Sequence, residues 1–132
     1  AAVLASGMLP LTEAHFAAWS DRDALLRQLQ FTQWRLESVT PWERDRLFEA
    51  LKALAAEMGL KIRDFLAPLF IAIAGTSATI SVIDSMEMLG SDLSRARIRH
   101  AIETLGGISK KKLKDVEKAY AALGREADAP AE

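Results

Sequence analysis

The sequence predicts an all-α fold, a helical bundle of about six helices. Apolar residues recur at spacings of three and four through most of the chain, which is typical of helices with one buried face. No segment alternates apolar and polar residues with the period of two that a half-buried strand requires. Glycine or proline separates the apolar segments. The one strand candidate is the apolar run at 70–74, and its continuity with the preceding helical pattern favours a helix.

The first helical half, residues 12–58, follows a lead-in at residues 1–11. Its predicted helices are a short one at 12–18, a second from Ser20 to about Ser38 and a third from Thr40 to Met58. Ser20 and Thr40 are expected to cap their helices, because a side-chain oxygen can accept from the exposed N–H groups of the first turn. Pro41 suits the first helical position, and Gly59 suits a left-handed helix end.

The second half, residues 60–105, carries the remaining core helices. They are predicted at 62–74 with a kink or restart at Pro68, at 80–89, and from an N-cap at Ser91 to about residue 105. A small polar turn from Gly75 to Thr79 joins the first two. A lysine-rich helix at 109–123, capped by Ser109, follows a double glycine, and residues 124–132 are expected to form a flexible tail.

Composition limits the possible functions. With 132 residues the chain can form one domain with a core of its own. The net charge of −1 marks no general nucleic-acid binder, although residues 91–118 hold eight Lys or Arg against four Asp or Glu. The absence of cysteine excludes disulfides, thiolate catalysis and cysteine zinc sites. No apolar run approaches the ~20 residues of a membrane helix, so we expect none in this chain. The missing initiator Met indicates a processed chain or a piece of a longer protein.

Catalytic and metal-binding patterns are lacking in the sequence. His15 and His100 are the only histidines, and neither has a ligand-like partner three or four residues away. The phosphate-binding patterns GxxxxGK[ST] and GxGxxG do not occur. We therefore expect packed or solvent-exposed histidines, and neither a catalytic residue nor a bound metal.

The stretch from Gly59 to Leu93 resembles the C-terminal anticodon-binding domain of bacterial glutamyl-tRNA synthetases. That family carries a run of the form L-G-K-x-x-x-P-[LI]-R-x-A-x-[TA]-G-x-x-x-[ST]-P-x-[LI]-F-[ED]-x-[ML]-x-[LV]-L-G. The residues in matching order are Leu60, Lys61, Pro68, Leu69, Ala72, Ala74, Gly75, Thr79, Val82, Ile83, Asp84, Met86, Met88, Leu89 and Gly90. With Trp42 and Glu43 upstream, the resemblance covers roughly residues 25–98.

This resemblance implies a fold and a function. The fold would be the helical anticodon-binding domain of class I glutamyl-tRNA synthetases. The function would be to hold the anticodon stem-loop of a glutamate-accepting tRNA while a catalytic domain, absent from this chain, aminoacylates it. ATP and Mg would belong to that parent enzyme, since HIGH-like and KMSKS-like motifs are missing here and we expect no cofactor in this chain. The expected partners are tRNA and the catalytic domain of the synthetase.

The resemblance also implies a base-reading site. The family's site uses the arginine of P-[LI]-R, a threonine and an apolar residue, which fall on Phe70, Thr79 and Val82 of this chain. Phe70 departs from the pattern, because phenylalanine can stack or pack but lacks the donors of arginine. The alternatives are that Phe70 is a core residue and that Thr79 is only the N-cap of the next helix.

Basic side chains could contact the RNA backbone. The candidates are Lys61, Arg63, Arg95, Arg99, Lys110, Lys111 and Lys114. Arg95 and Arg99 are four residues apart and share a helix face, whereas Arg97 points elsewhere. The alternative is that these are ordinary solvated faces, with Trp19, Trp34 and Trp42 in the core. The competing function is a helical protein-interaction module that has lost anticodon reading; a structural appendage of a larger enzyme is a third.

Overall fold

The computed structural model describes residues 11–74 and 81–128. In order, the elements are the 3-10 helix η1 (Glu13–Phe16) and the α-helices α2 (Arg22–Glu37), α3 (Arg44–Glu57), α4 (Ile62–Ala74), α5 (Val82–Leu89), α6 (Ser91–Thr104) and α7 (Lys110–Asp128). No strand occurs in these two ranges, and residues 70–74 belong to α4. The all-α prediction is therefore confirmed. α4 runs without interruption through Pro68.

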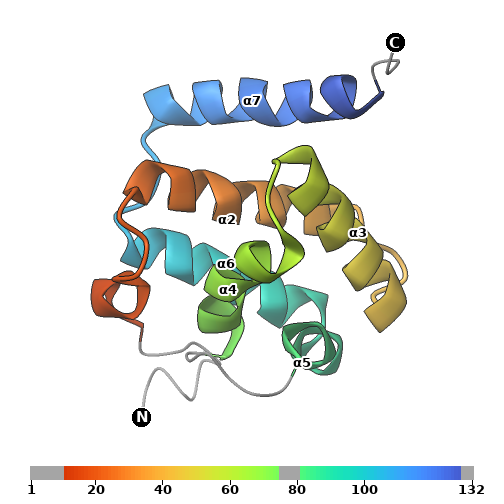
Figure 1. Cartoon of the computed structure of the whole chain (residues 1–132). Helices are drawn as coiled ribbons and strands as arrows, with labels where there is room; N and C mark the ends of the chain where they lie inside the picture. The colour runs from red at the N-terminus through yellow and green to blue at the C-terminus, as the bar shows by residue number, and fades with distance from the viewer. Residues whose placement is uncertain (1–10, 75–80, 129–132) are drawn as a thin grey trace.

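The helices form a stacked bundle, with α7 across one end and α5 at the other (Figure 1). Between them, α2 packs most extensively on α6, and α4 packs on α5 and α6. α3 lies against α2, α4 and α5 and also contacts α7. The end of α4 and the start of α5 therefore lie far from α7.

One apolar core holds α2 to α6 together. Each of these helices contributes fully buried side chains, among them Leu29, Leu51, Phe65, Met86 and Ile98. The described side chains of α7, by contrast, are only partly buried where they pack against this core. Because burying a large apolar side chain contributes about 1.5–3 kcal/mol, α2 to α6 carry most of the stability and α7 is a peripheral layer.

Two predicted N-caps in the first half are wrong. Asp21, not Ser20, caps α2, and its carboxylate accepts from the N–H of Ala24 at 3.1 Å. The third helix begins at Arg44 and not beside Thr40. Its first N–H group donates to the carboxylate of Glu87 in α5, at 2.8 Å. A side chain distant in sequence thus replaces the expected local cap.

The caps of the second half also differ from the prediction. Ser81 caps α5, which begins at Val82 and not at residue 80, and its oxygen accepts from the N–H of Asp84. Ser91 is the first residue of α6 and Gly90 takes the N-cap position, without a side-chain bond. Ser109 does cap α7 as predicted, by accepting from the N–H of Lys112 at 3.2 Å.

Gly59 ends α3 in the predicted way. Gly59 has φ +74°, the left-handed conformation that favours glycine. The N–H of Leu60 bonds to the carbonyl of Ala55 and that of Gly59 to Ala56, so α3 closes with a Schellman motif. α7 continues to Asp128, beyond the end predicted at residue 123. Of the expected tail, residues 129–132 lie outside the described part of the chain.

Candidate nucleic-acid interface

Two of the three predicted base-reading positions are described: Phe70 lies in the last half of α4, and Val82 lies at the start of α5. Phe70, in the last half of α4, is half-buried and packs against the core. Val82, the first residue of α5, is only 1% exposed. Thr79 lies outside the described residues. Of the two described positions, only Phe70 has exposed surface that an RNA base could contact.

The side chain of Arg97 contacts the same end of α4, although Arg97 belongs to another helix. It belongs to α6, and its Nη1 donates to the backbone carbonyl of Ile73 at 2.5 Å. Ile73 lies three residues after Phe70, so the guanidinium is within one helical turn of that position. Burial lowers the pKa of Arg97, because removal from water disfavours the charged form. The guanidinium is therefore held partly desolvated.

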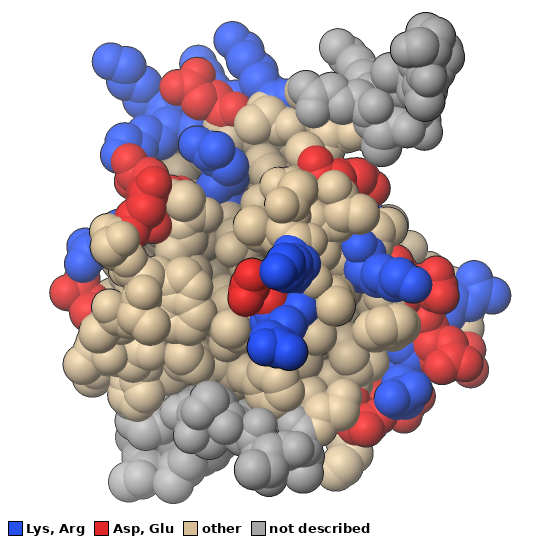
Figure 2. Space-filling view, in the orientation of Figure 1, with Lys and Arg blue, Asp and Glu red and all other residues tan. Residues whose placement is uncertain are grey.

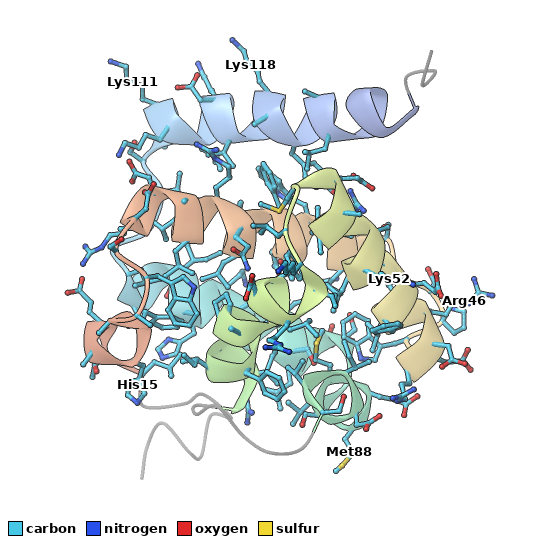
Figure 3. All side chains as sticks on the ribbon, in the orientation of Figure 1. His15, Arg46, Lys52, Met88, Lys111 and Lys118 are labelled. Atoms are coloured by element: carbon cyan, nitrogen blue, oxygen red, sulfur yellow. The ribbon has the colours of Figure 1, made fainter. Side chains whose placement is uncertain are left out.

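A small hollow adjoins Arg97. It has a volume of about 160 Å³ and is lined by Ile73, Ser85, Met88, Leu89 and Arg97. Met88 stands at its edge with 84% of its surface exposed. Figure 3 shows the Met88 side chain pointing from α5 away from the body of the molecule. The hollow thus combines apolar walls with one cation.

The predicted backbone-contacting residues fall into separate groups. Lys110, Lys111 and Lys114 are exposed on α7, over which Lys and Arg side chains gather (Figure 2). Lys111 and Lys118 point away from the bundle (Figure 3). Since α7 lies at the opposite end from α5, these lysines cannot share a contact with the hollow.

The other basic candidates lie nearer the middle of the molecule. Lys61 and Arg63 are exposed at the start of α4. On α6, Arg99 is exposed, whereas Arg95 is half-buried and its Nε is buried without a hydrogen-bond partner. Within the described ranges, none of the seven predicted basic residues takes part in an ion pair.

An aromatic cluster docks α7 on the bundle. The ring of Tyr120 lies 5.3 Å from the rings of both Phe31 and Trp34 in α2. Arg35 donates from Nε to the Tyr120 hydroxyl at 3.1 Å and pairs with Glu57 of α3 at 2.7 Å. Burial disfavours the charged form of Arg35, but the bonds to Glu57 and Tyr120 outweigh it and raise its pKa. α7 is thereby fixed with its lysines outward.

The three tryptophans pack against the core, and His15 bonds to its neighbour Thr12. Trp19, Trp34 and Trp42 are partly buried against the core, as predicted, and the indole N–H of Trp42 donates to the carbonyl of Met86 at 2.8 Å. His15 is exposed, and its Nδ1 accepts from the N–H of Thr12 at 3.0 Å. The part of the chain that the structure describes holds no group of three or more His, Asp or Glu able to bind a metal.

Comparison with known proteins identifies the family. The model of the anticodon binding domain matches residues 1–102. The chain belongs to this family. The resemblance predicted from residues 59–93 is thus confirmed, and the match ends within α6. None of the helices in the described ranges is long and apolar enough to cross a membrane.

Curated relatives of this anticodon-binding domain are glutamate–tRNA ligases. The relative from Cellvibrio japonicus is 54% identical over 134 residues, covering 99% of this chain and 26% of the relative. Those from Marinomonas and Saccharophagus degradans are 52% and 51% identical, covering 89% and 92% of this chain and 24% of each relative. The chain therefore spans about a quarter of the length of the curated relatives it matches.

The contact of Arg97 with the end of α4 was not predicted from the sequence. The spacing on α6 did predict that Arg97 lies on a different helix face from Arg95 and Arg99, because residues two apart in a helix point in different directions. Its surroundings depend on how α6 crosses the end of α4, which no local pattern in the sequence indicates.

Proposed function

We propose that the chain is the C-terminal anticodon-binding domain of a glutamate–tRNA ligase. In this role it binds the anticodon stem-loop of a glutamate-accepting tRNA and positions the RNA for aminoacylation by a catalytic domain outside this chain. The observation that carries the proposal is the family match over residues 1–102, joined to about 50% identity with glutamate–tRNA ligases across nearly the whole chain. Such a function would place the protein in the cytoplasm.

The end of α4 and the start of α5 would face the anticodon bases. Single-stranded RNA is usually recognised by splaying its bases and stacking them on side chains. Phe70 supplies a stacking surface, and the resemblance assigns Thr79 a contact with a base. Val82, being buried, would act by holding the start of α5 in place rather than by touching the RNA.

Basic side chains would position the RNA through its phosphates, which carry charge but no sequence information. Lys61, Arg63 and Arg99 are exposed and free of ion pairs within the described ranges, so their charge is available to an incoming backbone. The lysines of α7 would meet a different segment of RNA from the bases at α5, because the two surfaces are at opposite ends of the bundle.

Binding of the chain to glutamate tRNA and to an unrelated tRNA, at low and at moderate salt, tests the proposal. We expect tighter binding to the glutamate tRNA and a steep loss of affinity with salt, because neutralised phosphates release counterions. Equal weak binding to both tRNAs, or binding that salt does not weaken, would contradict it and would favour the protein-interaction module.

A further inference from the structure

The family pattern places an arginine at the position that Phe70 occupies, yet a guanidinium is present at that end of α4. This guanidinium belongs to Arg97 of α6, which donates a hydrogen bond to the carbonyl of Ile73 in the last turn of α4. An arginine of α6 thus lies where α4 ends.

The surroundings of Arg97 suit an aromatic ligand. The hollow of about 160 Å³ beside it has apolar walls from Ile73 and Leu89 and the hydroxyl of Ser85. The exposed Met88 at its edge offers a flexible, polarizable thioether, which contacts aromatic rings favourably.

We infer that Arg97 and Met88 form a binding site for one unpaired nucleobase of the tRNA anticodon loop, with Arg97 in the role that Phe70 cannot fill. This inference rests on the proposed function. The planar guanidinium can stack on a base, and the exposed thioether of Met88 can contact the same ring. Met88 lies on α5 and Arg97 on α6.

If Arg97 only caps the C-terminus of α4, its replacement by lysine should have little effect on RNA binding. A cation at a helix C-terminus satisfies terminal carbonyls and interacts favourably with the helix dipole, so Arg97 also stabilises α4. Lysine can supply that charge and a single donor, but it lacks the planar fork that reads or stacks on a base. Arg97→Lys therefore separates the two roles.

The experiment measures the affinity of the chain for glutamate tRNA and for the same tRNA with one anticodon base substituted. The proteins are the wild type, Arg97→Lys, Met88→Ala and a control, Arg46→Lys, on an exposed arginine of α3. We expect Arg97→Lys to unfold at nearly the wild-type temperature while losing about tenfold of its preference for the native anticodon, within the range typical of one base contact. Met88→Ala should weaken binding to the native tRNA. It should have less effect on the tRNA in which the base bound by Arg97 and Met88 has been substituted. Arg46→Lys should leave the preference unchanged.

The outcomes separate this inference from the proposed function. If the wild type prefers the native anticodon and Arg97→Lys retains the whole preference at each anticodon position, the inference is overturned and the proposed function stands. If the wild type itself has no preference between glutamate tRNA and other tRNAs, both fail. A loss of preference confined to one anticodon position in Arg97→Lys and Met88→Ala supports the inference.

Discussion

The backbone N–H of Arg44 lies 2.8 Å from the Oε2 atom of Glu87, so a side chain of α5 caps the first turn of α3. The Nε of Arg44 in turn bonds to Asp84 of α5 at 2.6 Å. These contacts join the two halves of the domain across 40 and 43 residues of sequence. The start of α5, next to the proposed base-reading surface, is thereby held by the first half of the chain.

Loss of the Glu87 carboxylate should destabilise this junction. We expect Glu87→Ala to lower the free energy of unfolding by about 1 kcal/mol, as for loss of an ordinary N-cap, and Glu87→Gln to retain part of it because the amide oxygen still accepts. Thermal unfolding measures the difference, which corresponds to about 4 °C in Tm. Glu103→Ala, on an exposed glutamate of α6, is the control; equal Tm values for Glu87→Ala and this control would refute the capping role.

The helices were predictable from the sequence because their signals are local. Apolar spacing located each helix, and Gly59 ended α3 where a left-handed residue was expected. The N-caps were harder, because several polar residues compete at each helix start. At the start of α2, Asp21 and not Ser20 accepts the capping hydrogen bond. At the start of α3 the acceptor is Glu87, which lies far away in sequence, so no local pattern could indicate it.

Tyr120 should control how firmly α7 is attached. Tyr120→Phe keeps the ring contacts with Phe31 and Trp34 but removes the acceptor for Arg35. We expect a loss of about 1–2 kcal/mol, because the Nε of Arg35 is left without its partner. Amide hydrogen exchange should then become roughly 5- to 30-fold faster in α7 than in the wild type, with little change in α6. Lys118→Gln, on the exposed face of α7, serves as the control. Uniform acceleration across all helices would contradict a local role.

The lysines of α7 should add to RNA binding without adding specificity. We expect replacement of Lys110, Lys111 and Lys114 by glutamine to reduce the slope of log affinity against log salt by roughly 2–3, because each phosphate contact contributes about 0.7–0.9. The preference between tRNAs should persist, since phosphates carry no sequence information. Lys52→Gln, on α3, is the control. An unchanged salt slope would show that α7 is only a solvated face.

Gly59 should resist replacement for conformational reasons alone. A Cβ built there meets no atom within 4 Å, so Gly59→Ala introduces no clash. Its φ of +74° is nevertheless unfavourable for alanine, and we expect a loss of about 1–2 kcal/mol in unfolding free energy. Gly59→Asn should lose less, because asparagine tolerates the left-handed region. Chemical denaturation compares them; equal stability of all three proteins would contradict this account.

The site was less predictable from the sequence than the fold. The motif order located the α4–α5 end through Phe70 and Val82, but their burial depends on packing between distant helices. The contact of Arg97 with Ile73 arises only when α6 crosses α4. The spacing of residues along one helix cannot predict a contact that forms only where two helices cross.

Chemical footprinting of glutamate tRNA by this chain tests the central claim most directly. If the domain holds the anticodon stem-loop, the anticodon nucleotides should be protected at low and moderate salt while the acceptor end stays reactive. An unrelated tRNA should show weaker protection that disappears at moderate salt. Protection spread evenly over the RNA, or equal for both tRNAs, would contradict anticodon binding.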